Sequence, residues 1–470
     1  MITVSSAYET AINASSRYIV PKVEVYFDGD SNPPTIFTGS GLTKIRFLEE
    51  ASADNGNPLG LVSSNDIELS FDNSSRNFTP TNTAGLYYGK LKPNVLVKPY
   101  LGLELPGATY EYIPLGVFRT GDWSSPSGTV EATVTCFDRL YEIGDKDVPM
   151  LPVKQNTTVG ELFVLLFTAL GITDFSVDAS LNQPIPIDWL PQGNVRNALQ
   201  TLAVAGNCSV ATNRYGYIVV RSNFITGTVV ETWTDANQIF TAENPQKYLD
   251  TYSKVKINYY QPYIKPSASL LKVENLKIPN GGLTLTNISF TTGPVATVDQ
   301  VILSGAVNSL VDSVEYGAWG ITVTITNTSV EETVTLEVTG KAIDSISSSY
   351  ELQDDTAVAS FGEKVFPVEN YLIQSLDVAK TYAAELLQYV KDPLANISLS
   401  IRGNPAVEVG DVIQIQNDTD KIGTVDFVPT RITLNYDGAL DSTVEGRKVA
   451  ANTRYTWAYI GPGMYEYVEY

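Results

Sequence analysis

Alternation of apolar and polar residues is the dominant pattern in the first 147 residues. In KVEVYF, DIELSF and TVEATVTCF every second residue is apolar. This period of two is typical of β-strands that bury one face. Turn-rich clusters such as DGDSNPP and DNSSRN separate the runs. Because several such strands must bury one face and protect their edges, the pattern predicts a closed or nearly closed β-barrel over residues 1–147.

Helical patterns interrupt the strands over residues 148–225. In NTTVGELFVLLFTALG, Thr158 and Glu161 form a T-x-x-E capping box, and Gly171 is placed to end the helix. A second helix is predicted in NVRNALQTLAVAG, followed by strands in CSVAT and YIVVRS. Two helices and a hairpin predict a small α/β domain.

Strands return after residue 225. Residues 266–364 are interpreted as an inserted β-rich domain, in which ITVTITN and TVTLEVTG form a hairpin about TSVEE. A helix is predicted to begin near Ser375 and to stop at Pro393. We predict a second barrel that combines residues 226–265 with residues 365–450, the helix packing on it.

The stretch IRGNPAVEVGDVIQIQ, residues 401–416, contains two apolar runs on either side of Gly410 and Asp411. We interpret the Gly-Asp pair as a sharp corner between paired strands, because glycine has a permissive backbone and aspartate can accept hydrogen bonds from nearby amides. No ligand is expected there.

Composition restricts the function more than it identifies it. The 470 residues are 43% hydrophobic and 18% charged, as in a folded protein. The 31 basic and 52 acidic residues give a net charge of −21, which argues against stable binding of nucleic acid. The chain has no histidine, so the commonest general base and metal ligand is missing. Neither a secretory signal nor an apolar stretch long enough to span a membrane is recognised, and we expect a soluble protein made in the cytoplasm.

Candidate chemical sites are weak. DGDSNPP begins like a calcium loop, but Pro33 stands where the loop needs glycine. The carboxylate pairs Asp354–Asp355 and Asp418–Asp420 lie in polar, turn-like stretches without an apolar surround that would raise a pKa. Cys136 and Cys208 are interpreted as small core residues. We therefore expect no catalytic residue, no metal and no cofactor.

The last 20 residues, 451–470, form an aromatic tail, TRYTWAYIGPGMYEYVEY being its dense part. One interpretation is a chain end that packs on its own domain. The alternative is a docking site for a partner protein, because exposed aromatic residues often anchor interfaces. The candidate docking residues are Trp457, Tyr459, Tyr465 and Tyr467.

Three stretches together resemble the tail hub proteins of tailed bacteriophages. They are PLGVFRTGDWSSPSGTVEATVTCFDRLYEIGD, NALQTLAVAGNCSVATNRYGYIVV, and IRGNPAVEVGDVIQI followed by RITLNYDGALDSTVEGR. The family includes the central hub of contractile-phage baseplates and the N-terminal region of siphophage tail-associated proteins. The resemblance implies a mainly β fold with α+β parts: two tube-like β-barrel domains, a small α/β domain and an inserted β domain.

The resemblance also implies a function without catalysis. Three chains with two similar barrels each would present six near-equivalent units, and so join a sixfold tail tube to a threefold tail tip in the virion. The implied partners are two further copies of the chain, a distal tail or tail tube protein, a tape-measure protein, and a tip spike or fibre protein. DNA would leave through the central channel, where an acidic surface would prevent sticking.

Two other functions remain as alternatives. Abundant Tyr and Trp on β scaffolds suggest a carbohydrate-binding adhesin of the tail tip. A glycosidase that uses two of the carboxylates named above is the third hypothesis.

Overall fold

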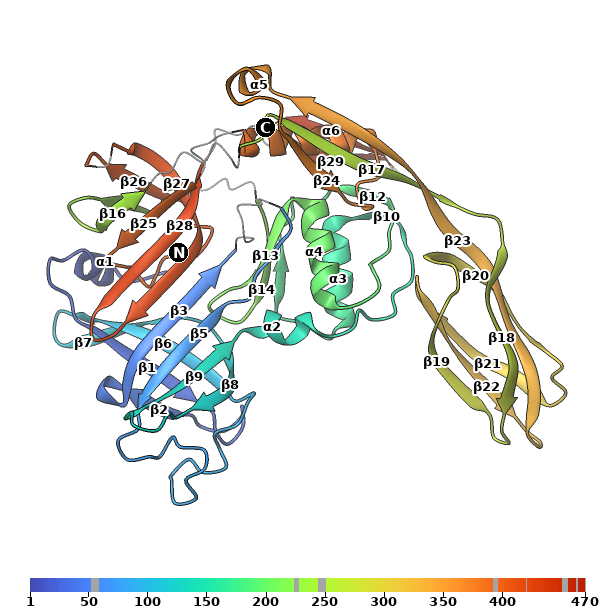
Figure 1. Cartoon of the computed structure of the whole chain (residues 1–470), viewed down its shortest axis with the longest axis horizontal. Helices are drawn as coiled ribbons and strands as arrows, with labels where there is room; N and C mark the ends of the chain where they lie inside the picture. The colour runs from blue at the N-terminus through green and yellow to red at the C-terminus, as the bar shows by residue number, and fades with distance from the viewer. Residues whose placement is uncertain are drawn as a thin grey trace.

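The structure is a computed structural model that describes residues 1–51, 59–223, 228–243, 251–391, 396–419, 421–449, 455–461 and 464–469. The fold is mainly β with α+β parts, which confirms the predicted fold class. A continuous 14-stranded sheet lies on the left of Figure 1, helices α3 and α4 occupy the middle, and a β-rich arm extends to the right. Among the described residues, no helix is both long and apolar enough to cross a membrane.

The first part of the large sheet, called unit 1 here, comes from the first 144 residues. Strand β1 shows the expected alternation, since every second residue from Ile19 to Val25 is buried. Its elements are α1 (Ser6–Ile12), β1 (Ile19–Val25), β2 (Thr35–Thr38), η1 (Gly39–Gly41), β3 (Leu42–Glu50), β5 (Asp66–Asp72), β6 (Leu96–Leu105), β7 (Thr109–Pro114), β8 (Phe118–Ser124), β9 (Glu131–Phe137) and α2 (Arg139–Gly144).

The second part, unit 2, continues the same sheet. Its strands are β15 (Glu231–Thr234), β16 (Ile239–Glu243), β25 (Asn396–Ile401), β26 (Ile413–Asn417), β27 (Gly423–Tyr436) and β28 (Leu440–Lys448). Strand β27 pairs antiparallel with β3 of unit 1, with Arg431 opposite Glu50 and Tyr436 opposite Ile45. A single cluster of buried residues underlies both units. The two predicted barrels are therefore parts of one sheet rather than two separately closed sheets.

The two units repeat the same strand order. Unit 1 reads β3-β5-β9-β8-β6-β1 across the sheet, and unit 2 reads β16-β25-β28-β27-β26-β15. We number the six strands of each unit 1 to 6 by their order in the chain. Read across the sheet, both units then give the order 2-3-6-5-4-1. Each neighbouring pair is antiparallel in both units, except that β15 and β26 are parallel where β1 and β6 are antiparallel. The sheet order therefore indicates an internal duplication.

Register and irregularities repeat as well. Equivalent rows across three strands are Leu42, Phe71 and Ala132 in unit 1, and Ile239, Ile401 and Ser442 in unit 2. Strand β3 shifts register against β5 after Leu42, and β16 shifts against β25 after Ile239. Likewise, β8 shifts against β9 after Thr120, and β27 shifts against β28 after Pro429. Bulges at matching positions support an internal duplication, because a bulge at the same position bends each strand in the same way.

The α/β unit follows the prediction closely. It contains β10 (Gln155–Thr158), α3 (Val159–Ala169), β11 (Phe175–Val177), β12 (Pro184–Ile187), α4 (Val195–Gly206), β13 (Cys208–Thr212) and β14 (Ile218–Ser222), and β4 (Leu61–Val62) pairs with β13. Thr158 and Glu161 form the predicted capping box of α3. Gly171 follows the helix with a φ of +70°, a conformation that glycine adopts without strain.

The helix predicted near Ser375 is α6 (Leu376–Val390), capped by the Ser375 side chain. It contacts β17 (Lys254–Ile264) and β23 (Glu332–Gln353), which form a separate sheet with β24 (Val365–Glu369) next to α5 (Asp355–Phe361). The prediction that α6 packs on the second barrel is wrong. Its apolar stripe buries Tyr382 and Leu386 against Val255 and Ile257, so β17 and β24 also lie outside unit 2.

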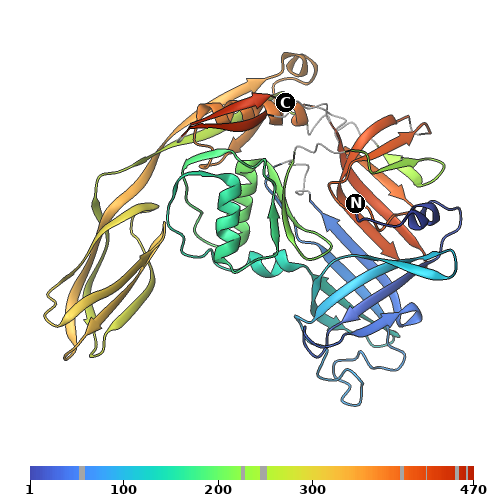
Figure 2. The same ribbon diagram turned by 180° about the vertical axis from the view of Figure 1, so that it is seen from behind.

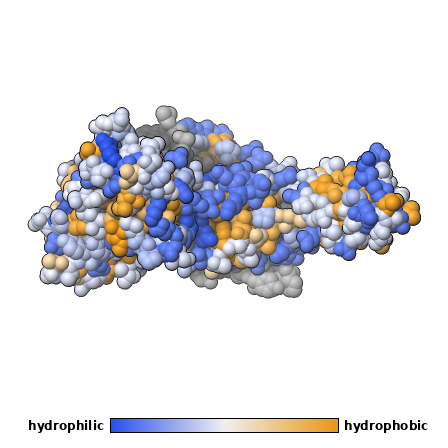
Figure 3. All heavy atoms as spheres, turned by 90° about the horizontal axis from the view of Figure 1, so that it is seen from below, coloured by the Kyte–Doolittle hydropathy of each residue, from blue (hydrophilic) through white to orange (hydrophobic). Residues whose placement is uncertain are grey.

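The arm contains β18 (Ala268–Ile278), β19 (Leu283–Ser289), β20 (Val295–Ser304), β21 (Ser309–Tyr316), β22 (Gly320–Asn327) and the first part of β23. The predicted hairpin of β22 with β23 is wrong. Strand β22 pairs with β19 and β21, whereas β23 pairs with β18 and β20. The alternating apolar faces of the two strands belong to different sheets, which pack against each other in one core. Figure 2 shows the arm projecting from the body, and Figure 3 shows apolar residues exposed at its far end.

An aromatic contact joins the base of the arm to the α/β unit. Trp319 Nε1 donates a hydrogen bond of 2.6 Å to the carbonyl oxygen of Leu190. Trp189 stacks on Tyr371 with ring centroids 4.8 Å apart, and the Tyr371 hydroxyl donates to the Trp189 carbonyl oxygen. Trp319 thus joins the arm to the α/β unit, and Tyr371, which follows β24, joins the sheet packed on α6 to the same unit.

We expect Trp319→Phe to lower the free energy of unfolding by about 1 kcal/mol, because the Leu190 carbonyl loses its donor while the ring remains. Limited proteolysis should then cut between the arm and the body faster than in the wild type. Tyr215→Phe is the control, since Tyr215 is 59% exposed. Equal cleavage rates in both variants would contradict the assigned role of Trp319.

Candidate functional site

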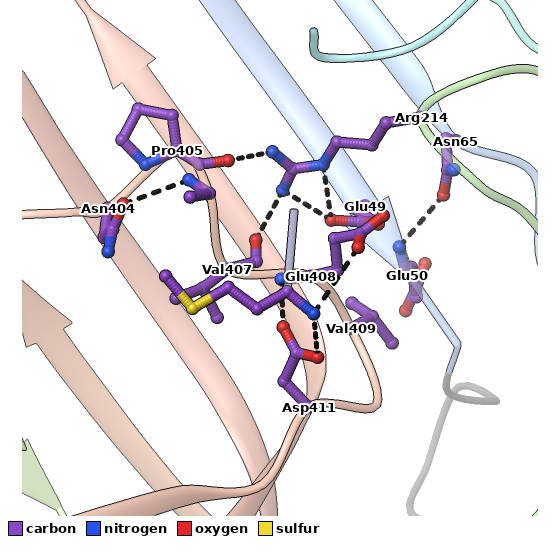
Figure 4. A network of polar contacts seen from close by, with 12 residues as sticks. Glu49, Glu50, Asn65, Arg214, Asn404, Pro405, Val407, Glu408, Val409 and Asp411 are labelled. Carbon is purple, nitrogen blue, oxygen red and sulfur yellow. Dashed lines mark hydrogen bonds and ion pairs between the residues drawn. The ribbon is translucent and has the colours of Figure 1, made fainter. Parts of the chain in front are cut away.

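The most unusual feature of the described residues is a buried polar junction where unit 1, unit 2 and the α/β unit meet (Figure 4). Glu49 and Glu50 come from the end of β3, and Arg214 comes from the turn between β13 and β14. The loop of residues 402–412, between β25 and β26, completes it. We call these residues the junction. Within the part of the chain that the structure describes, no group of three or more His, Cys, Asp or Glu residues could hold a metal ion.

Arg214 binds all three units together. Its side chain is 1% exposed, and its Nη2 donates to a Glu49 carboxylate oxygen at 2.7 Å and to the Val407 carbonyl at 2.7 Å. Nη1 donates to the Pro405 carbonyl, and the guanidinium lies over the Phe47 ring, 5.1 Å from its centroid. A planar guanidinium with five donors suits such a multiple contact. The residue therefore fixes the turn of the α/β unit against both sheet units.

Glu49 occupies a core-facing position. Ile45, Phe47 and Glu49 alternate along β3 and are all buried. Burial raises the pKa of Glu49, while the charge of Arg214 opposes this rise. Glu49 falls at the alternate positions of β3 that are otherwise apolar and buried, a sequence signal that could have identified this site. That signal was not used in the sequence analysis. Arg214, in the polar turn NRYG, carries no comparable signal.

The Gly410–Asp411 corner has the predicted local chemistry. Gly410 has a φ of +89°, and an Asp411 carboxylate oxygen accepts a hydrogen bond of 2.7 Å from the Glu408 amide. The same side chain contacts the N-terminal ammonium of Met1, and Arg221 donates to the Val409 carbonyl at 2.9 Å. The corner is thus an anchor for other segments.

The prediction that the corner lies between paired strands is wrong. The apolar run before it, residues 405–409, forms no strand, and only the run after it belongs to a strand, β26. Strands β25 and β26 are separated in the sheet by β28 and β27. The connection must therefore cross from one position in the sheet to another, and it meets the α/β unit on the way. Next to it lies a cavity of about 330 Å³, lined by residues of all three units, including Glu50, Arg221 and Pro429.

A second buried carboxylate connects unit 1 to the α/β unit. Asp138 is 2% exposed and accepts hydrogen bonds from the amides of Asn65 and Tyr141 at 2.8 and 3.2 Å. Asn65 in turn donates to the Thr212 carbonyl at 2.8 Å and accepts from the Glu50 amide at 3.1 Å. Burial raises the pKa of Asp138 to about 6, although these hydrogen bonds oppose the rise.

The residues nominated for catalysis or metal binding have other partners. Asp354 caps α5 and lies 2.8 Å from Lys391, whose hydrogen bond holds the pKa of Asp354 below its usual value. The backbone amide of Asp418 donates to Asp235, and Asp420 lies outside the described residues. In the proposed calcium loop, Asp28 pairs with Lys90 and Asp30 with Arg119. Cys136 and Cys208 are buried, as predicted, and burial raises the pKa of both thiols.

The predicted docking residues lie on a hairpin of β29 (Tyr455–Gly461) and β30 (Met464–Glu469). Trp457 is opposite Tyr467, and Tyr459 is opposite Tyr465, so the four positions form two cross-strand pairs. Their side chains lie outside what the structure describes. A docking role for Trp457, Tyr459, Tyr465 and Tyr467 stays a prediction.

Comparison with known proteins identifies the fold. No protein-family model matches the sequence, and no curated protein is significantly similar to it. The fold is similar to the 43 kDa tail protein of prophage MuSo2 from Shewanella oneidensis, with a TM-score of 0.51 and 10% identity over 91% of this chain and 97% of that one. A tail protein from Neisseria meningitidis gives the same TM-score and identity, covering 92% and 96% of the two chains.

Proposed function

We propose that this chain, which has the fold of bacteriophage tail proteins, is the structural tail hub of a tailed phage. Three copies would adapt a sixfold tail tube to a threefold tail tip and surround the channel through which DNA leaves. The observation that carries the proposal is the duplicated sheet. Three chains with two units of the same strand order offer six similar surfaces to a sixfold partner and one threefold axis to the tip.

The junction supplies the rigidity that this role needs. A hub can imitate six equal subunits only if its two units keep a constant orientation. The pairing of β27 with β3 joins them directly, and the Arg214 contacts brace the pair from the α/β unit. The buried polar network thereby favours one arrangement over other packings of the same units.

The face of the sheet opposite the core is proposed to line the channel. It is rich in hydroxyl side chains, including Thr133, Thr135, Thr433, Thr443, Ser398 and Ser400. Both signs of charge are present on it: basic side chains include Lys44, Arg46 and Arg431, and acidic ones include Glu50, Asp66, Glu68, Asp72, Glu131, Asp441 and Glu445. Acidic residues therefore outnumber basic ones on these strands, in keeping with the net charge of −21. Short polar side chains with an acidic excess would let DNA slide without binding it tightly.

The proposed partners follow from the position of a hub. They are a distal tail or tail tube protein on one side, a tip spike or fibre protein on the other, and a tape-measure protein in the channel. The site of action is the virion, at the tail tip or baseplate. No catalytic activity is part of the proposal.

Native mass measurement and negative-stain imaging test the assembly. We expect a particle of three chains, each of 51.2 kDa, that appears as a threefold ring with a central hole. A dilution series separates a stable trimer from aggregation, because a specific trimer keeps its mass over a range of concentrations. A strict monomer at high protein concentration would count against the hub.

A carbohydrate-binding adhesin is the alternative that one observation favours. Tyrosines such as Tyr18 and Tyr215 are each 59% exposed, as sugar-stacking residues often are. Binding of the purified chain to a glycan array would support this alternative. Release of reducing ends from host polysaccharide would revive the glycosidase hypothesis.

A further inference from the structure

Unit 1 carries a cluster of tyrosines on the outward face of β1, β6 and β7. The other face of these strands packs into the core through residues such as Val23, Leu101 and Ile113. We give the name platform to six residues whose side chains belong to the outward face: Tyr18, Lys22, Tyr100, Glu104, Tyr110 and Tyr112.

The platform lies on a different side of unit 1 from the proposed channel lining. Besides pairing with β6, strand β1 contacts β3, which stands at the other end of the strand order of the unit, so unit 1 curls round its core. The outward sides of β1 and β6 therefore point away from those of β9 and β5. A ligand can reach the tyrosines from outside the channel.

The strand register brings the platform residues side by side. The Tyr18 carbonyl oxygen accepts a hydrogen bond of 3.0 Å from the Glu104 amide, and Glu104 is opposite Tyr110. These three residues form one row across the strands. In the next row Tyr112 is opposite Gly102, where an added Cβ would lie 2.6 Å from a carbon of the tyrosine ring. The ring of Tyr112 therefore lies directly over the backbone of Gly102.

The inner rings of the platform are held in place by a lysine. Lys22 Nζ lies 4.0 Å from the ring centroid of Tyr100 and 4.8 Å from that of Tyr112, and it donates a hydrogen bond of 3.0 Å to Glu24. Such cation–π contacts stabilise a fixed arrangement of the rings. Tyr18 and Tyr110, at the outer row, are 59% and 39% exposed.

The internal duplication shows that the fold does not need tyrosines on this face. By place in the strand order, β15 and β26 of unit 2 are equivalent to β1 and β6. Their outward positions hold Thr232 opposite Gln414, and Thr234 opposite Gln416. The tyrosines therefore belong to unit 1 alone, which is expected of a binding surface rather than of a scaffold.

We propose that the platform binds a neutral carbohydrate chain, with Tyr18 and Tyr110 stacking on two of its sugar rings and Glu104 accepting hydrogen bonds from hydroxyl groups between them. The two tyrosines are two strand spacings apart, about 10 Å, which is close to the length of a disaccharide. Tyrosine combines an apolar ring face with a polar hydroxyl, as a sugar ring requires. The proposal needs neither three copies nor a channel, so it is independent of the hub function.

The charges around the platform favour an uncharged ligand. Lys22 and Lys98 balance Glu24 and Glu104 on this face, although the whole chain has a net charge of −21. Partial burial raises the pKa of Tyr110, and the nearby Glu104 carboxylate raises it further. The Tyr110 hydroxyl therefore stays protonated and can donate to a sugar oxygen while Glu104 accepts.

Affinity electrophoresis of the full chain, in gels that contain a polysaccharide, tests the proposal. The probes are neutral polysaccharides of glucose, galactose or mannose, and alginate is the acidic comparison. Tyr18→Ala and Tyr110→Ala each remove one stacking ring, whereas Tyr18→Phe and Tyr110→Phe keep it. Tyr215→Ala is the matched control, because Tyr215 in the α/β unit is as exposed as Tyr18. The melting temperature of each variant confirms that it is folded.

We expect at least one neutral polysaccharide to retard the wild-type chain. Each alanine variant should bind it about tenfold more weakly, whereas the phenylalanine variants and the control should stay close to the wild type. No retardation by any probe, binding to alginate alone, or wild-type retardation of the double variant Tyr18→Ala/Tyr110→Ala would overturn the proposal. A monomer in native mass measurement would remove the hub function and leave the platform standing.

Discussion

Replacing Arg214 with methionine is expected to lower the free energy of unfolding by about 3–5 kcal/mol, because the buried Glu49 carboxylate then loses its only salt-bridge partner among the described residues. The Pro405 and Val407 carbonyls lose their donor in the same variant. Methionine keeps much of the side-chain volume, so the loss reports on charge and hydrogen bonding more than on a cavity. Urea unfolding followed by tryptophan fluorescence measures the change.

Two further variants separate the charge from the position. Arg214→Met combined with Glu49→Gln should recover part of the lost stability, since no charge is then left unpaired in the junction. Arg46→Met changes an exposed arginine on β3, the strand of Glu49. Its free energy of unfolding should stay within about 0.5 kcal/mol of the wild-type value. If Arg214→Met costs no more than Arg46→Met, Arg214 does not brace the two units.

Replacing Asp138 with asparagine should remove a pH-dependent contribution on the order of 3 kcal/mol, the equivalent of a shift of about two pKa units. The pKa of this carboxyl rises from 3.8 to about 6 in the folded chain because the side chain is buried. Between these values the folded state binds the proton more tightly than the unfolded state. The contribution is therefore fully present below pH 3.8 and is lost as the pH rises through about 6. Asparagine does not titrate and lacks this dependence.

The measurement is the difference in unfolding free energy between wild type and Asp138→Asn from pH 4 to pH 7.5. The wild type should lose its relative advantage as the pH rises across this range. Asp145→Asn, exposed at the end of the same helix α2, is the control and should follow the wild-type profile. Parallel profiles for wild type and Asp138→Asn would show that Asp138 is not held in the protonated form.

Local signals predicted the local structure well. The Thr158–Glu161 capping box and the start of helix α6 after Ser375 both appear where the sequence places them. These features depend on residues within one turn of each other, so their physics is complete in a short stretch of chain. The resemblance to tail hub proteins, carried by three separated stretches, also agrees with the observed fold.

Strand partners were the main error. The sequence predicts that β22 pairs with β23, because they are neighbours in the chain, but in the structure they lie in different sheets. It also predicts paired strands on either side of Gly410 and Asp411, but residues 405–409 form no strand. Alternation shows which face of a strand is buried, but every alternating strand offers the same kind of face to any neighbour.

The amino-acid sequence by itself therefore determined the class of fold, the helices α3, α4 and α6, and the absence of histidine chemistry, because these depend on composition and on neighbours in the chain. Only the tertiary structure decided that two units repeat one strand order, that Glu49 and Arg214 meet 165 residues apart, and that β27 of one unit pairs with β3 of the other. Each of these depends on which distant segments come to lie side by side. That choice is made by the packing of the whole core, and no short stretch of sequence contains it.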